Sequence, residues 1–279
     1  MIRTSRQLKA LVRNISKGNS AKALIIIRNY VMERFLERLS LSNYRDNLIL
    51  KGGTLVSAMV GLDNRSTMDF DATVKNMPLS EESAKKAVED ITSIEIDDGM
   101  LFEIKSVASI MDESDHPGIR VILEATLETM RIPLKIDFSS GDVITPHEVS
   151  YSFKLLFENR SISILAYNLE TVLSEKLETL LTRGTANTRM RDFYDIYILE
   201  STQSHNMDAA VLKIAFKNTS DKRSSIAVTD SMDLILDEVE NSPDMMVLWK
   251  NYQRKFDYAA DIGWNEVMQT VRKLCSRVT

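Results

Sequence analysis

The sequence predicts an α+β fold, in which a mixed β-sheet flanked by helices is followed by a helical C-terminal half. Strand-like segments, in which apolar and polar residues alternate, lie within residues 1–167. From residue 168 onward the apolar residues recur every three or four positions, which is the period of a helix. With 279 residues, of which 44% are hydrophobic, the chain is long enough to bury a substantial core. We therefore expect an α/β part over residues 1–167 and a helical part over residues 168–279.

The N-terminal region is predicted to contain two helices, over residues 5–16 and 20–40. In the second, apolar residues spaced by three and four positions form one stripe: Leu24, Ile27, Val31, Phe35 and Leu39. The next four elements follow from short apolar runs and from turn residues between them. They are a strand over 48–50, a helix over 54–60, a strand over 66–74 and a helix from Ser80 to about residue 94.

Three longer strands are expected next, over residues 101–110, 118–127 and 131–139. The middle one alternates most clearly, with one apolar face formed by Ile119, Val121, Leu123, Ala125 and Leu127. The chain then shows a last short strand and the helices of the C-terminal half. These are the strand 161–166, the helices 168–183 and 190–201 joined by a loop at 184–188, and three or four amphipathic segments within 206–279.

The net charge of −5 is unevenly distributed. Residues 1–38 hold nine Lys or Arg and two acids, so they carry +7, which leaves −12 for the rest of the chain. A basic arm on an acidic body is a typical footprint for nucleic acid. The alternative is a solvated helix face, or a face that docks on the acidic body.

The expected location is the cytoplasm, without a membrane partner. A single cysteine, Cys275, excludes an intrachain disulfide and fits a reducing compartment. The early apolar run at residues 23–27 is too short for a secretory signal and is flanked by Lys22 and Arg28. No segment approaches the roughly 20 apolar residues that span a bilayer.

Three aspartates are candidates for a metal site. Asp69 and Asp71 alternate on one strand and should point the same way, and an adjacent strand would place Asp137 beside them. Carboxylates held together repel each other unless a divalent cation lies between them, and their hard oxygen atoms suit Mg²⁺. The glycine pair at Gly52-Gly53 would let backbone N–H groups approach a phosphate. The pattern favours phosphoryl or nucleotidyl transfer, although a D-x-D sequence alone also occurs by chance in acidic proteins.

A second group of charged residues lies on the helices after residue 168. Lys176 and Arg183 are seven positions apart, and Asp192 and Asp195 are three apart, so each pair shares a helix face. The alternative is structural: Asp192 would favour the dipole of its helix, and Arg191 with Asp195 would form a surface ion pair.

Five short motifs in this order resemble those of the AbiEii/AbiGii toxins, a family of nucleotidyltransferases related to DNA polymerase β, and most of all its streptococcal members. They are Lys51-Gly52-Gly53-Thr54, Arg65-x-x-x-Asp69-x-Asp71, Lys135-Ile136-Asp137-Phe138, Glu175-Lys176 and Arg189-x-Arg191-Asp192-x-x-Asp195. The match covers about residues 45–200. It implies a mixed sheet of the polymerase-β type, with the helical half completing the active-site cleft.

The resemblance also implies the roles of individual residues. It implies catalytic roles for Asp69, Asp71, Lys176 and Asp192, and metal-ligand roles for Asp69, Asp71 and Asp137. The residues expected to bind the nucleotide are Lys51, Gly52, Gly53, Thr54, Arg65, Ser66, Arg183 and Asp195. Two positions depart from the usual pattern: Thr54 replaces a serine, and Arg191 replaces a lysine.

Members of the family are toxins of two-gene toxin–antitoxin systems that act in abortive infection against bacteriophage. The resemblance therefore implies Mg²⁺-dependent transfer of NMP from an NTP, such as GTP or a pyrimidine NTP, to the 3′ end of an RNA such as tRNA. Basic residues within 1–38 would contact the RNA. The antitoxin would be encoded next door and form no stable complex with the toxin. The alternatives are nucleotidylation of a protein or small molecule, and a non-catalytic NTP-binding regulatory module.

Overall fold

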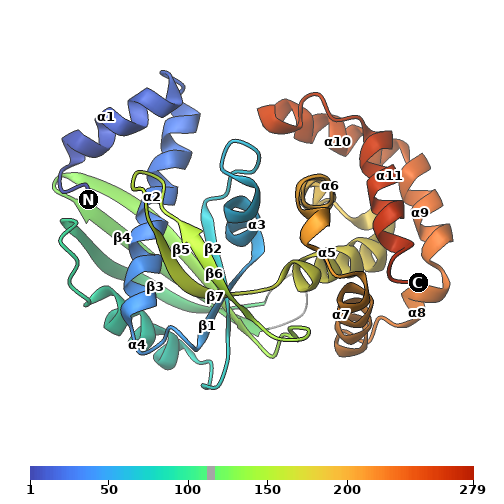
Figure 1. Cartoon of the computed structure of the whole chain (residues 1–279), viewed down its shortest axis with the longest axis horizontal. Helices are drawn as coiled ribbons and strands as arrows, with labels where there is room; N and C mark the ends of the chain where they lie inside the picture. The colour runs from blue at the N-terminus through green and yellow to red at the C-terminus, as the bar shows by residue number, and fades with distance from the viewer. Residues whose placement is uncertain (112–116) are drawn as a thin grey trace. The chain divides into compact units, whose positions relative to one another are not determined.

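The computed structural model describes residues 1–111 and 117–279, which form two compact units (Figure 1). Unit 1 comprises Met1–Ala58, Ser66–Asp142 and Val149–Ala166, and unit 2 comprises Met59–Arg65, Val143–Glu148 and Tyr167–Thr279. The first contains the sheet and the second is helical. The α+β class predicted from the sequence is therefore confirmed.

Unit 1 is built on a seven-stranded mixed sheet with the strand order β3-β4-β5-β2-β1-β7-β6. The pairs β2–β5 and β1–β7 are parallel, and the other neighbours are antiparallel. The strands are β1 (Leu48–Lys51), β2 (Asp69–Val74), β3 (Met100–Met111), β4 (Pro117–Leu127), β5 (Met130–Ser140), β6 (Val149–Lys154) and β7 (Ser161–Ala166). β6 was not predicted, whereas the three long strands lie where the alternation placed them.

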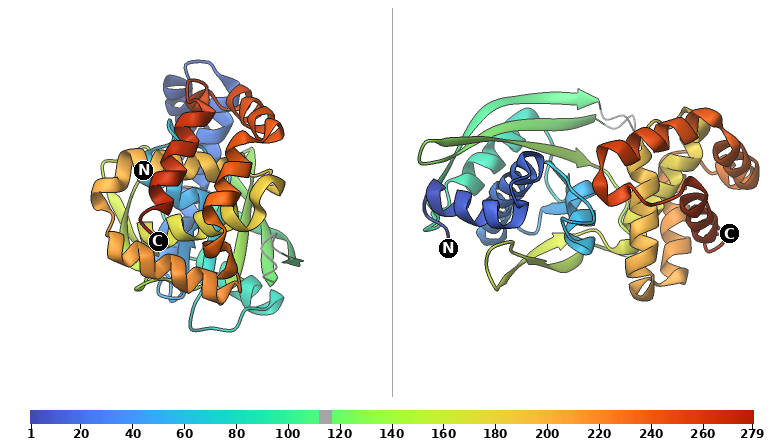
Figure 2. Two further views of the ribbon diagram at one scale, coloured as in Figure 1. Left: turned by 90° about the vertical axis from the view of Figure 1, so that its right-hand side faces the viewer. Right: turned by 90° about the horizontal axis from the view of Figure 1, so that it is seen from above.

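One face of this sheet is covered by α2 (Ser20–Leu41) and α4 (Glu81–Thr92), with α1 (Ser5–Ser16) packed on α2 (Figure 2). α2 lies against β5 and β7, and α4 lies against β3 and β4. Phe70 of β2 packs edge-on against Phe35 of α2, with ring centroids 5.5 Å apart. Because neighbours along a strand point to opposite faces, Asp69 and Asp71 project from the face that α2 does not cover.

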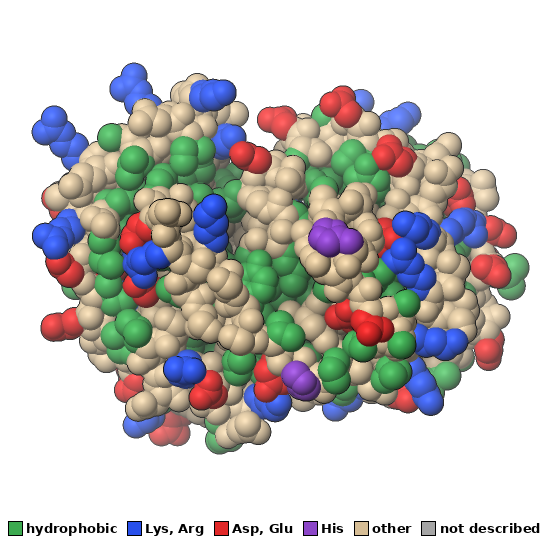
Figure 3. All heavy atoms as spheres, in the orientation of Figure 1, with side chains coloured by type: hydrophobic (Ala, Val, Ile, Leu, Met, Phe, Trp, Pro, Cys, Tyr) green, Lys and Arg blue, Asp and Glu red, His purple; other side chains and the backbone are tan. Residues whose placement is uncertain are grey.

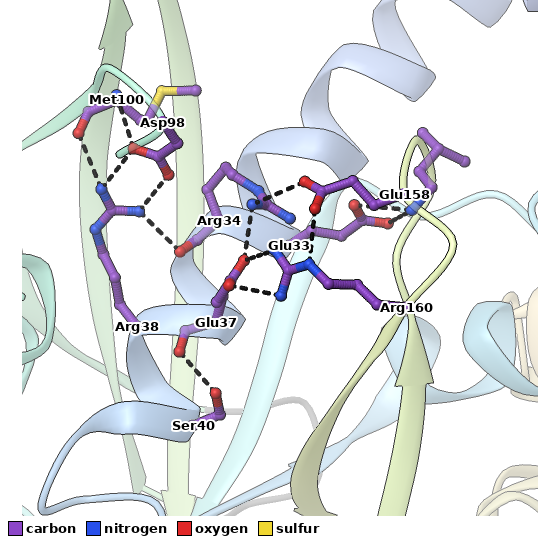
Figure 4. A network of polar contacts seen from close by, with 10 residues as sticks. Glu33, Arg34, Glu37, Arg38, Ser40, Asp98, Met100, Glu158 and Arg160 are labelled. Atoms are coloured by element: carbon purple, nitrogen blue, oxygen red, sulfur yellow. Dashed lines mark hydrogen bonds and ion pairs between the residues drawn. The ribbon is translucent and has the colours of Figure 1, made fainter. Parts of the chain in front are cut away.

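The helix α2 is buried more widely than its predicted stripe requires. Phe35 is fully buried as expected, but Leu24 is 46% exposed. Charged residues are buried instead, and a network of ion pairs holds them (Figure 4). In this network Arg34 lies 2.7 Å from Glu37, which also pairs with Arg160, and Arg38 pairs with Asp98. Each of these buried charges therefore has a partner of opposite charge.

The elements around the glycine pair differ slightly from the prediction. The helix α3 (Gly52–Val60) begins at the glycine pair itself, two residues earlier than expected, and β2 begins at Asp69 rather than residue 66.

The alternating apolar face predicted for β4 is buried along its whole length: Ile119, Val121, Leu123, Ala125 and Leu127.

Unit 2 is a helical assembly with an aromatic core. Its helices are α5 (Leu169–Arg183), α6 (Met190–Gln203), α7 (Ala209–Lys222), α8 (Ala227–Asp230), α9 (Met232–Asn241), α10 (Pro243–Lys255) and α11 (Trp264–Cys275), with 3₁₀ turns at Gly184–Ala186, Ser204–Asn206 and Asp257–Ala259. Trp249 and Trp264 are buried, and the ring centroid of Trp264 lies 5.3 Å from that of Phe193. No helix in the part of the chain that the structure describes has the length and apolar character to cross a membrane.

Candidate active site

Four charged residues form one row across four neighbouring strands of unit 1. Arg120 in β4 is the register partner of Asp137 in β5. Asp137 is the partner of Asp71 in β2, and Asp71 is the partner of Lys51 in β1. Register partners project from the same face of a sheet, so the row carries the charges +, −, −, + along that face. The prediction that Asp71 and Asp137 lie side by side is confirmed.

A second row, two residues away, adds two more charges to this face. Asp69 is the register partner of Lys135. The Lys135 Nζ atom lies 3.1 Å from Oδ2 of Asp69 and 3.6 Å from Oδ2 of Asp137. We call these six residues the sheet cluster: Lys51, Asp69, Asp71, Arg120, Lys135 and Asp137.

Asp137 is held by Arg120 through two parallel hydrogen bonds. Arg120 Nε donates to Oδ1 and Nη2 donates to Oδ2, both at 2.8 Å. Both carboxylate oxygens of Asp137 are therefore engaged by a cation, which the sequence did not predict. The available signal was the position of Arg120 on the polar face of an alternating strand, but its register with β5 could not be read from the sequence.

Asp71 lies directly against the start of α3. Gly52 has φ = +65°, and a Cβ atom there would stand 2.9 Å from Cβ and Cγ of Asp71, and closer still to Oδ2. Glycine is thus needed both for its backbone conformation and for the space. Burial, and next the negative charge of Asp137, raise the pKa of Asp71. The charges of Lys51 and Lys135 act in the opposite direction.

Lys51, which was expected to bind the nucleotide, forms an ion pair within unit 1. Its Nζ lies 2.7 Å from Oδ2 of Asp142, which also accepts a hydrogen bond from the hydroxyl of Ser139 at 2.7 Å. Burial would raise the pKa of Asp142, but the charge of Lys51 together with hydrogen bonds from Lys51, Thr73 and Ser139 outweighs it and holds that pKa well below its usual value. Asp142 was missed in the sequence because no motif contains it.

Thr54, expected in the phosphate loop, is buried and has a structural contact. Its hydroxyl donates to the backbone carbonyl of Asp69 at 2.6 Å, which ties α3 to the start of β2. The expected contact of this hydroxyl with phosphate is at odds with its burial. Gly52 and Gly53, by contrast, are partly accessible at the N-terminus of α3, where backbone N–H groups are available.

The donor set of the sheet cluster fits a divalent cation through two residues. Asp69 and Asp71 offer hard carboxylate oxygens from one face of one strand, and Asp69 is 46% exposed. Within residues 1–111 and 117–279, no group of three His, Cys, Asp or Glu side chains is arranged to hold a metal ion. Asp137 as a third ligand therefore stays a prediction, and its oxygens here face Arg120.

Unit 2 holds a second charged group, which we call the helix cluster: Arg65, Lys176, Asp192 and Asp195. Lys176 of α5 lies 2.8 Å from Oδ1 of Asp192 and 2.6 Å from Oδ2 of Asp195, both on α6. Arg65 donates from Nε to Asp195 at 2.6 Å and from Nη2 at 3.2 Å. The cluster thus unites residues that are up to 130 positions apart in the sequence.

In the helix cluster, burial and the neighbouring charges shift the pKa of each group in opposite directions. Burial would lower the pKa of Lys176, but Asp192 and Asp195 outweigh it and raise it, so Lys176 stays a cation. Burial would raise the pKa of Asp195, but Arg65 and Lys176 together lower it. Arg65 and Asp195 are fully buried, which is at odds with the expected nucleotide contact. In the structure Asp195 binds both Arg65 and Lys176.

Two further residues, Arg183 and Ser66, were predicted to bind the nucleotide. Arg183 is half-buried in the last turn of α5, and Ser66 is nearly buried just before β2. The surface pair proposed as an alternative, Arg191 with Asp195, does not form, because Asp195 is buried and binds Arg65 and Lys176. Arg191 instead lies over the ring of Phe256, 5.4 Å from its centroid.

The basic N-terminal segment is only partly available to a partner. Arg6, Lys9 and Arg13 are exposed on α1, and Lys and Arg side chains project from this region in Figure 3. Arg34 and Arg38, in contrast, are buried in ion pairs with acidic residues of unit 1. Burial makes Arg34 and Arg38 unavailable for the expected RNA contact, which stays a prediction for the exposed basic residues of this segment.

Comparisons with known proteins agree with this fold. A candidate nucleotidyltransferase from Helicobacter pylori has a similar structure, with a TM-score of 0.51 and 15% identity over 91% of this chain and 96% of that one. JHP933 from Helicobacter pylori is also similar, with a TM-score of 0.54 and 15% identity over 91% of this chain and 93% of that one. At this level of identity, the two matches show a shared fold. No curated protein sequence matches the chain.

The model of one protein family matches residues 34–270, which include both the sheet cluster and the helix cluster. That family is described as the nucleotidyl transferase AbiEii toxin of type IV toxin–antitoxin systems. The match covers most of the chain, and the resemblance drawn from the five motifs is confirmed. The protein belongs to the AbiEii family of nucleotidyltransferase toxins.

Proposed function

We propose that this toxin transfers NMP from an NTP to the 3′ end of an RNA, with tRNA as the foremost candidate, and that Asp69 and Asp71 hold the Mg²⁺ ion that the reaction needs. The observation that carries the proposal is that Asp69 and Asp71 lie on one partly exposed face of the sheet, beside the glycine pair at which α3 begins. Bound Mg²⁺ would neutralise charge on the phosphates of the nucleotide.

The residues of the chain supply positioning and charge. Backbone N–H groups at Gly52 and Gly53 would donate to phosphate oxygens at the start of a helix. In unit 2, Asp192 and Asp195 keep Lys176 protonated, and the family resemblance assigns this lysine a nucleotide-binding role. An RNA hydroxyl would attack the α-phosphate, and pyrophosphate would leave. Little covalent chemistry falls to the protein in such a transfer, because orientation and charge stabilisation lower the barrier.

The direct test is a labelling experiment with each of the four α-labelled NTPs separately, in the presence of total RNA and cell extract. We expect label in the RNA fraction, and a loss of at least about 10²-fold in rate for Asp69→Ala. Asp46→Ala is the control, because this aspartate is 74% exposed and lies outside the sheet cluster. Full activity of Asp69→Ala would contradict the proposal.

The same experiment separates the alternatives. Label in the protein or small-molecule fraction would identify a different acceptor for the same chemistry. NTP binding without incorporation of any nucleotide would indicate a non-catalytic module that has kept the fold. The toxicity of the wild type and of Asp69→Ala is measured in cells with and without the antitoxin gene. The comparison shows whether the toxicity that the antitoxin suppresses depends on nucleotidyl transfer.

A further inference from the structure

We propose that Arg120 is a positioning residue that withholds Asp137 from the metal site until a nucleotide binds. The inference rests on the proposed function, because it takes Asp69 and Asp71 as the metal ligands. Asp137 stands opposite Asp71 in the sheet register, where a third carboxylate ligand would be expected. Its two oxygens nevertheless face Arg120 at 2.8 Å each.

The geometry of the Arg120–Asp137 pair depends on having an arginine at position 120. A guanidinium and a carboxylate joined by two parallel hydrogen bonds form a strong and directional contact that only arginine can make. Both side chains of the pair are accessible to solvent: that of Arg120 is 38% exposed and that of Asp137 is 20% exposed. The pair can therefore exchange partners without disturbing the packing of the sheet.

The charges of the sheet cluster define what the pair controls. Three members, Asp69, Asp71 and Asp137, are negative. Of the three positive members, Arg120 pairs with Asp137, Lys135 contacts Asp69 and Asp137, and Lys51 pairs with Asp142 outside the cluster. While the Arg120–Asp137 pair is closed, a cation can bind Asp71 and also Asp69, whose contact with Lys135 it would replace. This agrees with the finding that no set of three acidic or other ligand side chains is arranged for a metal within the described residues.

A nucleotide triphosphate would open the pair. Phosphate oxygens bind arginine in the same two-pronged manner as a carboxylate, so they compete with Asp137 for Arg120. Once released, Asp137 would complete a set of three carboxylates beside Asp71. Metal and nucleotide would then favour each other's binding, because a coupling between two ligands is reciprocal. The full metal site would form only when the substrate is present.

The test measures Mn²⁺ binding in the absence of nucleotide, by electron paramagnetic resonance of the free ion. Arg120→Gln removes the cation, and Arg120→Lys keeps the charge but cannot form the paired hydrogen bonds. We expect both variants to bind Mn²⁺ more tightly than the wild type, by about tenfold for Arg120→Gln, because the number of charged ligands sets cation affinity. The double variant Arg120→Gln/Asp137→Asn has the same cluster charge as the wild type and should bind as the wild type does.

The control is Arg131→Gln, which removes a positive charge elsewhere on the same sheet. Arg131 is 73% exposed and lies six residues from Asp137 along β5, about 20 Å away. It should leave Mn²⁺ binding unchanged. The proposal is overturned if Arg120→Gln and Arg120→Lys both bind Mn²⁺ as the wild type does, or if only Arg120→Gln binds more tightly, which would indicate a simple effect of charge. An unchanged Mn²⁺ affinity in Asp69→Asn and Asp71→Asn would instead refute the metal site of the proposed function.

Discussion

Gly52 and Asp71 are packed so closely that the first residue has no room for a side chain. A Cβ atom at Gly52 would lie 2.9 Å from both Cβ and Cγ of Asp71, and the backbone at Gly52 has φ = +65°. The chain turn that starts α3 and the carboxylate proposed to bind metal therefore depend on each other. A change at the glycine acts on the aspartate directly.

We expect Gly52→Ala to reduce nucleotidyl transfer by at least about tenfold, because the new methyl group pushes the Asp71 carboxylate out of place. Gly18→Ala is a matched control. Gly18 has a similar backbone conformation, with φ = +84°, but no atom lies within 4 Å of an added Cβ. Both variants carry backbone strain of about 1 kcal/mol, so only a displaced Asp71 explains a selective loss of activity. Equal activities of the two variants would contradict this account.

Asp195→Asn should destabilise the protein by about 3 kcal/mol, because it removes the buried negative charge that Arg65 and Lys176 share. Asp192→Asn is the comparison, since Asp192 is on the same helix and also contacts Lys176, but its side chain is 14% exposed and its other cation, Arg189, lies 3.8 Å away. We expect a loss of about 1 kcal/mol or less for it. Urea unfolding followed by circular dichroism measures both, and equal losses would show that burial of Asp195 is not decisive.

Folding stability should fall as the pH rises from about 4.5 to 8, owing to Glu33. Burial raises the pKa of this carboxyl from 4.5 to about 8, although hydrogen bonding to the Leu156 backbone and the Arg34 charge act in the opposite direction. Between these two values the folded protein binds one more proton than the unfolded chain. Raising the pH therefore favours unfolding through this group.

Glu33→Gln removes this titration and keeps an acceptor for the backbone N–H of Leu156. We expect its melting temperature to depend less on pH than that of the wild type between pH 5 and 8. Glu37 and Glu158 are near Glu33 and are retained in both proteins. Parallel pH profiles of the two proteins would show that Glu33 is ionised in the folded state over this range.

Charge reversal at Arg6, Lys9 and Arg13 should weaken RNA binding and flatten its dependence on salt. Each phosphate contact that is lost lowers the slope of log K against log salt by about 0.7 for a single strand. All three side chains are exposed on α1, so the fold should not change. Fluorescence anisotropy at several salt concentrations gives the slopes directly.

The matched control reverses three exposed basic residues elsewhere in unit 1: Arg45, Lys85 and Lys86. The net charge of the protein changes by the same amount, so any general electrostatic effect is reproduced. An equal flattening of the slope in both triple variants would leave the α1 region as an ordinary solvated helix face.

Much of the local structure and part of the candidate site could be predicted from the sequence. Alternation along 118–127 and 131–139 identified two strands and their buried faces, and it placed Asp137 on the polar face. The glycine pair identified the start of α3 to within two residues. The family followed from five short motifs, and the match over residues 34–270 confirmed it.

Periodicity was less informative where charged residues are buried. The charge count of residues 1–38 placed Arg34 and Arg38 in a basic arm, whereas both are buried: Arg34 pairs with Glu37 of the same helix and with Glu158, and Arg38 pairs with Asp98. A charged residue can be buried only when a partner compensates it, and that partner is supplied by tertiary contacts. Leu24, which fitted the apolar stripe, is exposed for the converse reason, because no element covers it fully.

By itself, the sequence determined which way each side chain points along its own strand or helix, because a period of two or 3.6 residues is a local property. It thereby determined that Asp69 and Asp71 share a face. Only the tertiary structure decided what lies beside them. The register of β4, β5, β2 and β1 aligned Arg120, Asp137, Asp71 and Lys51 in one row, and folding of the helical unit joined Arg65 to Asp195. Hydrogen bonds and ion pairs between distant segments set these alignments, and no local pattern encodes them.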